Sequence, residues 1–438
     1  MGETGQPKRD SLRTLTLALV IAGVALRLWW VALSHTGTRL LHLGEASEAA
    51  LALARTGTIA DAFFAGQGPT AHLMPTMLVL SASVLRTFGP PSPAAALVLT
   101  AWALTQVFAG YWLARRLFAT IGAGPGVLAG GLAVLCLVPA FVAQECADFR
   151  FWEAGLASAM ALLNLWLIAT LSQRPVPNVQ PLLVAATLAA ATFFVSPTTG
   201  VAVYACWGAF TLRLPRPLAL RFAAAGAAAL ALCLAPWMLR NTQQLGHPIL
   251  LRSNFGLEIA LANHPAAVSG VDALAVQKAR MRGIHPFASR EAEARLRAAG
   301  GEVAYAQALG RVTWHWAAAH PLDFARLTLR HYRQFYLPDR WQGALTNWPV
   351  WEMPRIDAIR TIALLGLAGL ALGLARRRRF YPMLALYMTV AGLPYALVQP
   401  IPRYAYGLWP LYAFLAAQLL ADLATLLRRR SATPITRS

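Results

Sequence analysis

The sequence predicts an all-α, polytopic membrane protein. Of its 438 residues, 57% are hydrophobic and only 13% are charged, whereas a soluble domain is about half apolar and about a quarter charged. Apolar runs recur that match the roughly 20 residues a helix needs to cross a bilayer. The formal net charge is +20, and many of the arginines gather in clusters between these runs. That pattern indicates cytoplasmic loops of a membrane protein more strongly than a nucleic-acid-binding surface.

About ten segments are predicted to cross the bilayer. The first is an uncleaved anchor that follows Lys8, Arg9 and Arg13. The two short segments on either side of Ser196 indicate a tilted or broken hairpin. In chain order the predicted spans are 15–33, 94–114, 122–143, 153–172, 181–196, 199–212, 222–239, 361–375, 380–397 and 405–426.

The segment 71–88 decides the orientation of the chain. If it crosses the membrane, every later basic cluster falls outside; if it lies at the surface, all of them share one side with the N-terminus. The positive-inside rule selects the second arrangement, with both termini cytoplasmic and 71–88 at the outer surface. The clusters concerned are Arg115-Arg116, Arg174, Arg213/Arg216/Arg221, Arg376 to Arg379 and Arg428 to Arg430.

A long outer region separates two groups of spans. Its helical patterns cover 291–309 and 311–336, and aromatic residues interleaved with arginine run through 305–351. That composition is typical of interfacial amphipathic helices, with carbohydrate stacking as the alternative. The predicted organisation is a membrane module with catalytic outer loops over 1–239, an outer region over 240–360, and C-terminal spans with a basic tail over 361–438.

The scarce acids gather in two outer loops. Glu45 and Glu48 are spaced i,i+3 in a predicted interfacial helix, so their carboxylates share one face, which is unfavourable unless something compensates. Such a pair near apolar surface suits a general base or a cation site; the alternative is a solvated helix without a role. In the second loop, Glu145, Asp148 and Glu153 stand at a helix entrance, where acids are costly unless paired or functional. A polar collar at the membrane edge is the alternative there.

The segment after residue 239 carries phosphate- and sugar-binding residue types. Arg240 and Arg252 are suited to bidentate contacts with a phosphate. Asn254, Asn263 and His264 are suited to sugar hydroxyls. The alternative is a helix end with interfacial tryptophan and arginine anchors. The chain lacks the sequence patterns of P-loop ATPases, HExxH zinc proteases and GxSxG serine hydrolases.

The order of these features resembles the GT-C glycosyltransferases, in particular the bacterial family 39 group of protein mannosyltransferases and lipid A aminoarabinose transferases. The resemblance covers most of residues 12–425. Its motifs are PTAHLMP at 69–75, Pro-Trp-x-x-Arg-Asn at 236–241, RSNFGLEIALANHP at 252–265 and RYAYGLWPL at 403–411.

The resemblance implies roles for the acids. In this family an acid of the first outer loop serves at the catalytic centre, which by position is Glu45, with Glu48 able to take over part of the role. The family more often has Asp followed by Glu where this chain has Glu45 followed by Ala46. A second acid belongs to the next outer loop, and here Asp148 and Glu153 are equal candidates.

The resemblance also implies a donor site. Arg403, followed by Tyr404, matches the Arg-Tyr that precedes the last helix and is expected to bind the donor phosphate together with Arg240 or Arg252. His72 takes a position near the donor. Glu258 lies within the motif at 252–265 and joins Asn254, Asn263 and His264 as an expected sugar-binding residue.

The predicted function is inverting transfer of a sugar from a polyprenyl-phosphate donor to a lipid, glycan or protein acceptor of the cell envelope. The expected location is the bacterial inner membrane, with the active site facing outward. No cofactor is required, and Glu45, Glu48 and Asp148 are candidate ligands for a divalent metal. Nucleic acid is not an expected partner.

Two alternatives remain: a transporter or flippase of lipid-linked sugars, and a catalytically inactive lipid-binding member of the family. A transporter is expected to place charged groups along a path through the membrane. Only Arg27 and Asp422 lie well inside the predicted spans, which favours the enzyme.

Overall fold

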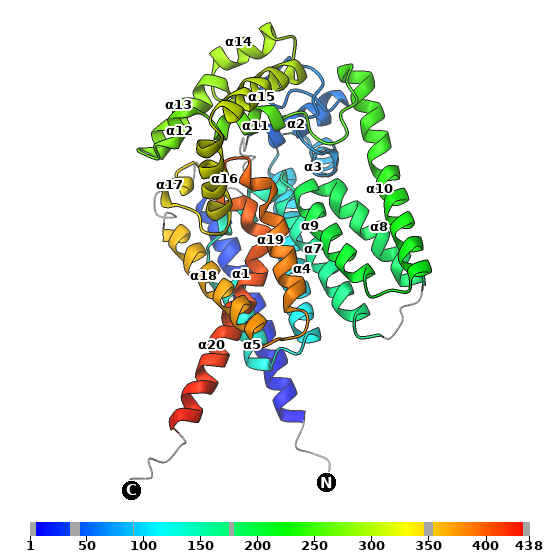
Figure 1. The fold of residues 1–438 in the computed structure, drawn as a ribbon, viewed down its shortest axis with the longest axis vertical. Coiled ribbons are helices and arrows are strands. Elements are labelled where there is room, and N and C mark those ends of the chain that lie inside the picture. The colour runs from blue at the N-terminus through cyan, green and yellow to red at the C-terminus, as the bar shows by residue number, and fades with distance from the viewer. Residues whose placement is uncertain (1–5, 36–43, 91, 175–178, 346–353, 432–438) are drawn as a thin grey trace.

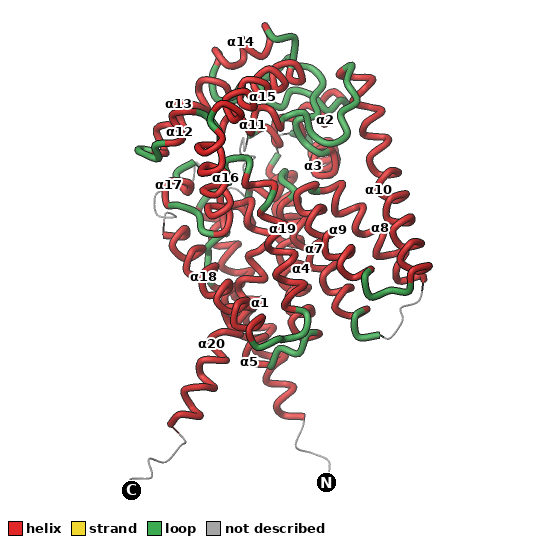
Figure 2. Tube along the Cα trace, in the orientation of Figure 1, coloured by secondary structure: helices red, strands yellow, loops and turns green. Residues whose placement is uncertain are grey.

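The computed structural model describes residues 6–35, 44–90, 92–174, 179–345 and 354–431. Within these residues the regular secondary structure is helical, and an isolated β-bridge joins Ala60 to Pro69. The predicted all-α class is therefore confirmed (Figure 2). Trp348 and Trp351 of the aromatic region lie outside the described residues.

Each of the ten predicted spans coincides with a helix of the bundle. The chain packs these helices mainly through contacts of α18 with α20, α4 with α7, α8 with α10, and α5 with both α1 and α20. The bundle helices are α1 (Gln6–Leu33), α4 (Pro93–Thr120), α5 (Pro125–Leu137), α7 (Ala154–Leu171), α8 (Val179–Val195), α9 (Pro197–Thr211), α10 (Arg216–Leu245), α18 (Pro354–Ala375), α19 (Tyr381–Gly392) and α20 (Trp409–Ser431).

Six helices in the described part of the chain are long and apolar enough to cross a membrane, or seven if a bent pair counts as one span. The bent pair joins α5 to the segment Val142–Arg150 at an angle of 75°. Helices α8, α9 and α19 have 17, 15 and 12 residues, fewer than the roughly 20 of a typical bilayer-crossing helix. The prediction of about ten full-length spans thus corresponds to six such helices, the bent pair that contains α5, and three shorter helices.

Small residues let α18 and α20 approach closely. A side chain at Gly366 would collide with Tyr412, and one at Gly369 would collide with the backbone of Leu415. Close approach at glycine is a common way to pack helices where lipid supplies no hydrophobic driving force. Since η4 leads directly into α20, this packing also fixes the start of the last helix.

The remaining helices gather at the other end of the bundle. Figure 1 shows α1 beginning and α20 ending at one end, with α2, α3 and α11 to α15 at the opposite end, as the predicted topology requires. Helix α3 has only 14 residues and packs on α2 and α4. These helices are α2 (Glu45–Thr56), α3 (Pro75–Phe88), α6 (Val142–Cys146), α11 (Phe255–Ala262), α12 (Pro265–Val268), α13 (Ala273–Ile284), α14 (Arg290–Ala298), α15 (Glu302–Ala319), α16 (Pro321–Tyr336), α17 (Arg340–Gly343) and the 3-10 segments η1 (Asp148–Arg150), η3 (Pro394–Ala396) and η4 (Pro402–Leu408).

The segment predicted to be helical over 291–309 forms two helices and not one continuous helix. It is divided into α14 and α15 at Gly300 and Gly301, whose φ angles are +86° and +113°. Glycine adopts these angles without the steric cost that other residues carry, so the pair breaks the helix. The second predicted segment, 311–336, is divided at His320-Pro321, because proline cannot continue the hydrogen-bond ladder of the preceding helix.

Candidate active site

The candidate site lies where three outer segments and the start of η4 meet. The carboxylate of Glu45 stands at the first residue of α2, directly after Gly44, whose φ is +96°. Arg252 and Glu258 come from the loop after α10 and from α11, and Arg403 comes from η4. The charges of Glu45, Arg252 and Arg403 all act on the carboxyl group of Glu258. The structure therefore brings together residues more than 350 positions apart.

Glu45 has a specific partner in His285, which stands between α13 and α14. Nε2 of His285 lies 3.2 Å from Oε1 of Glu45. The other ring nitrogen, Nδ1, accepts the backbone N–H of Phe287 at 3.3 Å. A nitrogen that accepts a hydrogen bond carries no proton, so Nε2 holds it and donates to the carboxylate. Sequence reasoning missed His285, because nothing in its local sequence connects it with a residue 240 positions earlier.

The surroundings of Glu45 keep it ionised. Burial by itself raises the pKa of its carboxyl group, but His285, His72 and Arg403 outweigh this, so that the net pKa lies below the ordinary value. Positive or donating groups close to a carboxylate favour its charged form. Glu45 is therefore a carboxylate at neutral pH.

His72 lies near Glu45, at the end of the first outer loop. Its ring is almost fully buried and packs edge-on against Phe63, with ring centroids 4.6 Å apart. Burial lowers its pKa to about 4, so the ring is neutral at pH 7. Its Nδ1 has no hydrogen-bond partner among the described residues, which leaves one buried polar atom beside Glu45 unused by the protein.

Arg403 faces the second acidic loop. Its guanidinium lies over the ring of Trp152, 4.1 Å from the centroid, and its Nη1 is 4.0 Å from Oδ2 of Asp148. A cation over the face of tryptophan is held by the ring's quadrupole. Of the two candidate second acids, Asp148 is thus the one in contact with Arg403.

Glu153 forms an ion pair with Arg252, through Oε1 and Nη2. The pair joins the entrance of α7 to the loop that precedes α11. Burial lowers the pKa of the Arg252 guanidinium, but Glu153, together with Tyr395 and Tyr404, brings the net pKa above the ordinary value, so Arg252 remains a cation. Its Nε is buried and has no hydrogen-bond partner within the described residues, so one N–H of this guanidinium is unused.

The expected sugar-binding residues Asn254 and Asn263 have different hydrogen-bond partners. Asn254 donates to Oε1 of Glu258 at 3.2 Å, next to Arg252. Burial raises the pKa of Glu258, and the nearby negative charge of Glu45 adds to this. Asn263, by contrast, donates to the carbonyl of Leu397 at 2.8 Å.

Arg240 is bound to the first outer loop, whereas Nε2 of the buried His264 has no hydrogen-bond partner among the described residues. Arg240 donates to the carbonyls of Thr70 at 2.7 Å and Ile59 at 2.6 Å. Two backbone partners fix this guanidinium to the first outer loop, so it holds the loop that ends in His72. Burial, together with Arg280, lowers the pKa of His264 to about 4.

Tyr404 belongs to a stack of three aromatic rings. Tyr395 lies 5.0 Å from Tyr404 with an angle of 22° between the planes, and Phe335 lies 4.8 Å from Tyr395 at 11°. The hydroxyl of Tyr395 is 3.0 Å from that of Thr198. The stack fixes the position of Tyr404, the residue after Arg403. It also connects η4 with α16 and with the start of α9.

Glu302 connects two segments of the site through hydrogen bonds, a role that was not predicted from the sequence. Its Oε2 accepts from Thr70 at 2.6 Å and from Gln67 at 2.9 Å, and its Oε1 accepts from the backbone of Ala71 at 2.7 Å and from Ser253 at 2.8 Å. Burial raises the pKa of this carboxyl, and its hydrogen bonds partly offset the rise. Glu302 therefore ties the residue before His72 to the residue after Arg252.

A buried ion pair supports the second acidic loop. Nη2 of Arg27 lies 2.7 Å from Oε2 of Glu145, with both side chains about 1% exposed. Glu145 also accepts the hydroxyls of Tyr111 at 2.5 Å and Tyr406 at 3.0 Å. Glu145 precedes Asp148 by three residues, and Tyr406 follows Arg403 by three. The cluster therefore fixes the positions of the two segments that carry Asp148 and Arg403.

Arg27→Met is expected to destabilise the protein by about 3–5 kcal/mol, because the carboxylate of Glu145 stays buried without its cation. The measurement is unfolding of the purified protein in detergent. The matched control is Arg326→Met, which breaks an exposed pair with Asp323 and is expected to cost at most about 1 kcal/mol. The double variant Arg27→Met/Glu145→Gln should recover part of the loss. Equal effects of Arg27→Met and Arg326→Met would contradict this role.

The described residues contain no group of three His, Cys, Asp or Glu side chains placed to hold a metal ion. The candidate set of Glu45, Glu48 and Asp148 is accordingly not brought together as a ligand set. Glu48 lies one turn after Glu45 in α2, where a carboxylate in the first turn is favoured by the helix dipole.

Comparison with known proteins shows the fold. The sequence matches no family model and none of the curated proteins. The structure is similar to three solved structures of the oligosaccharyltransferase from Archaeoglobus fulgidus. The apo form is 17% identical, with a TM-score of 0.53 over 98% of this chain and 53% of that one. The form with a tethered acceptor peptide is 14% identical, with a TM-score of 0.55 over 98% and 51%. The complex with an inhibitory peptide and a dolichol-phosphate is 16% identical, with a TM-score of 0.50 over 99% and 53%.

The fold and its membrane-length helices define an integral membrane protein with the GT-C fold, as the sequence motifs predicted. The chain spans about half the length of the oligosaccharyltransferase it matches.

Proposed function

We propose that this chain is a membrane glycosyltransferase that moves a sugar from a polyprenyl-phosphate donor to a lipid, glycan or protein acceptor, with inversion. The observation that carries the proposal is that the Glu45 carboxylate and the cations Arg252 and Arg403 all act electrostatically on one group, the carboxyl of Glu258. Helices α2 and α11, which carry Glu45 and Glu258, lie at the end of the bundle opposite the termini (Figure 1). Placement in the family 39 group rests on the sequence motifs alone. The oligosaccharyltransferase complex with a dolichol-phosphate supports a lipid-phosphate donor for this fold.

In the proposed mechanism, the donor phosphate binds to the guanidinium groups of Arg403 and Arg252. Arg403 is held over Trp152, and Arg252 is held by Glu153, so both are positioned before a ligand arrives. The unused Nε–H of Arg252 is a donor in a buried position. Cations fixed in this way stabilise the charge that develops on the leaving phosphate, without reorganisation at the moment of reaction. Tyr404 borders this region next to Arg403.

Glu45 is placed as the proton acceptor. The acceptor hydroxyl or amine attacks the anomeric carbon while the bond from that carbon to the phosphate oxygen breaks. The electron pair leaves with polyprenyl phosphate, and the acceptor's proton passes to the Glu45 carboxylate. A phosphate ester is already a good leaving group, so positioning and charge stabilisation suffice. His285 donates to Glu45 and orients it.

The proposal also expects the bound donor to raise the pKa of the general base, Glu45. Arg403 is one of the groups that lower the pKa of Glu45. A phosphate bound to Arg403 offsets that positive charge and places a negative one nearby, so the pKa of Glu45 rises when the donor is bound. Proton transfer is most efficient when the pKa of the base approaches the working pH.

The test is reconstitution of the purified chain in liposomes with a synthetic polyprenyl-phosphate sugar and membrane fractions as acceptor. The proposal expects release of polyprenyl phosphate that depends on the acceptor fraction. A donor that binds but is never consumed by any fraction would instead identify a lipid-binding protein without activity. Movement of intact donor across the bilayer would identify a transporter. After gene deletion, mass spectrometry of the membrane glycolipids identifies the sugar and the acceptor.

A further inference from the structure

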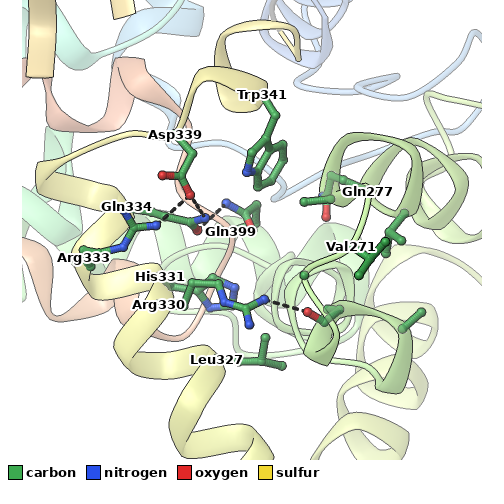
Figure 3. A pocket seen from close by; sticks show the side chains of 15 residues that line it. Val271, Gln277, Leu327, Arg330, His331, Arg333, Gln334, Asp339, Trp341 and Gln399 are labelled. Atoms are coloured by element: carbon green, nitrogen blue, oxygen red, sulfur yellow. Dashed lines mark hydrogen bonds and ion pairs between the residues drawn. The ribbon is translucent and has the colours of Figure 1, made fainter. Parts of the chain in front are cut away.

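A cavity lies among α12, α13, α16 and α17, and none of its lining residues is assigned a role in the transfer proposed above. It has a volume of about 160 Å³ and is enclosed by α12 and α13 on one side and by α16 and α17 on the other. Figure 3 shows Trp341, Gln399 and His331 on one side of it, and Val271 and Gln277 opposite. Pockets for drug-sized ligands measure about 300–1,000 Å³, so this cavity suits a ligand of one small ring.

The charged side chains around the cavity already form hydrogen bonds within the protein. Arg333 donates to Asp339 at 2.7 Å, and Gln334 donates to the same oxygen at 2.9 Å. Arg330 donates to the carbonyls of Ala267 at 2.8 Å and Val268 at 3.0 Å. Asp339 offsets the charge of Arg333, and the guanidinium of Arg330 already donates to two backbone carbonyls, so these side chains are held by the protein itself.

One buried acceptor in the cavity wall has no partner. The side chain of His331 is 2% exposed, and its Nδ1 has no hydrogen-bond partner in the described part of the chain. Burial, and to a smaller extent Arg330, lowers the pKa of His331 to about 4, while a hydrogen bond to the backbone of Ala396 opposes this. The ring is therefore neutral, and with one nitrogen bonded to Ala396 the other is free to accept. Buried acceptors of this kind are rare unless a ligand or water satisfies them.

The remaining walls combine an aromatic ring, short apolar side chains and amides. Trp341 offers a half-buried indole, while Val276 and Leu327 offer apolar surface. Gln277 is buried in the wall, and Gln399 donates to Gln334 at 3.2 Å. Aromatic faces pack against the C–H face of a sugar ring, and amides exchange hydrogen bonds with its hydroxyls.

We propose that this cavity is a binding site for a neutral saccharide ring, with a ligand hydroxyl donating to Nδ1 of His331. Its assignment to the acceptor side rests on the proposed function. The link between the two sites is the segment 399–403: Gln399 lines the cavity, the carbonyl of Pro400 accepts from Gln342 at 2.5 Å, and Arg403 follows three residues later. A glycan acceptor held in the cavity would approach the donor along this segment.

The test is saturation-transfer difference NMR on the full chain in nanodiscs, with methyl α-glucoside, methyl α-mannoside and methyl β-galactoside as neutral probes and glucuronate as the charged probe. His331→Phe removes the acceptor, Gln277→Leu removes an amide, and Ala273→Phe fills the cavity from α13. His331→Asn keeps an acceptor near the position of Nδ1. Leu329→Ala, on the exposed face of α16, is the matched control.

The proposal expects a signal for at least one neutral probe that falls at least tenfold in His331→Phe, Gln277→Leu and Ala273→Phe. The signal should return largely in His331→Asn and stay unchanged in Leu329→Ala. No signal for any neutral probe, a signal equal in all variants, or binding confined to glucuronate would overturn it. Glu45→Gln should retain the signal, so that loss of transfer and loss of sugar binding are read separately.

Discussion

Glu45→Gln is expected to lower the rate of sugar transfer by about 10²–10⁴-fold, the usual contribution of a general base. Glutamine keeps the size and hydrogen-bonding shape of the side chain, so His285 can still donate to it, but it does not accept the acceptor's proton. The measurement is release of polyprenyl phosphate by wild-type and variant protein at equal concentration.

The matched control for this change is Glu291→Gln, an exposed acid in the first turn of α14, which should leave transfer unchanged. Donor binding by Glu45→Gln should stay within a few-fold of wild type. Transfer by this variant at the wild-type rate would remove Glu45 from the chemistry and return the role to Glu48 or to Asp148.

The pH profile gives a second measurement on the same residue. Since the pKa of Glu45 lies below its ordinary value, the acid limb of kcat/KM should lie below about pH 4.5. Bound phosphate raises that pKa, so the acid limb of kcat should lie at higher pH than that of kcat/KM. The two parameters report the free enzyme and the bound complex, respectively. Coinciding limbs would contradict the proposed coupling between donor and base.

Arg403→Gln is expected to weaken donor binding by about 10–100-fold. A hydrogen bond to a charged group contributes about 1.5–3 kcal/mol, and about 1.4 kcal/mol corresponds to tenfold in affinity. Glutamine keeps packing against Trp152 but removes the cation. Titration with undecaprenyl phosphate measures the effect directly, and the KM of the acceptor should change much less.

Arg326→Gln on α16 is the control, because that arginine is exposed and pairs with Asp323 one turn before it. A change that raises the acceptor KM more than the donor Kd would place Arg403 on the acceptor side instead.

The sequence was sufficient for the fold because hydrophobic length, arginine clusters and four short motifs all depend on local composition. The positions of Glu45, Arg252, Arg403 and Asp148 could also be named, since each belongs to a motif or to a loop with an unusual excess of acid. Continuity was harder to predict: the break at Gly300-Gly301 depends on a pair of backbone angles, not on hydrophobic pattern.

The residues that the sequence did not reveal are partners across long separations. His285 and Glu302 contact the first outer loop from more than 230 positions away, and neither has a local pattern that distinguishes it from a surface residue. Glu145 was visible as an acid at a helix entrance, but its pairing with Arg27 depends on how α5 bends into α6. Arg240, predicted as an alternative to Arg252 beside the phosphate, binds two backbone carbonyls of the first outer loop, a pairing that its local sequence does not reveal.

The most direct test of the central claim is a cryo-EM structure of the full chain with undecaprenyl phosphate bound. The account predicts the phosphate within hydrogen-bond distance of both Arg403 and Arg252, with Glu45 facing it across a space the size of a sugar ring. A phosphate bound away from these arginines, or a lipid threaded between two groups of helices, would contradict it.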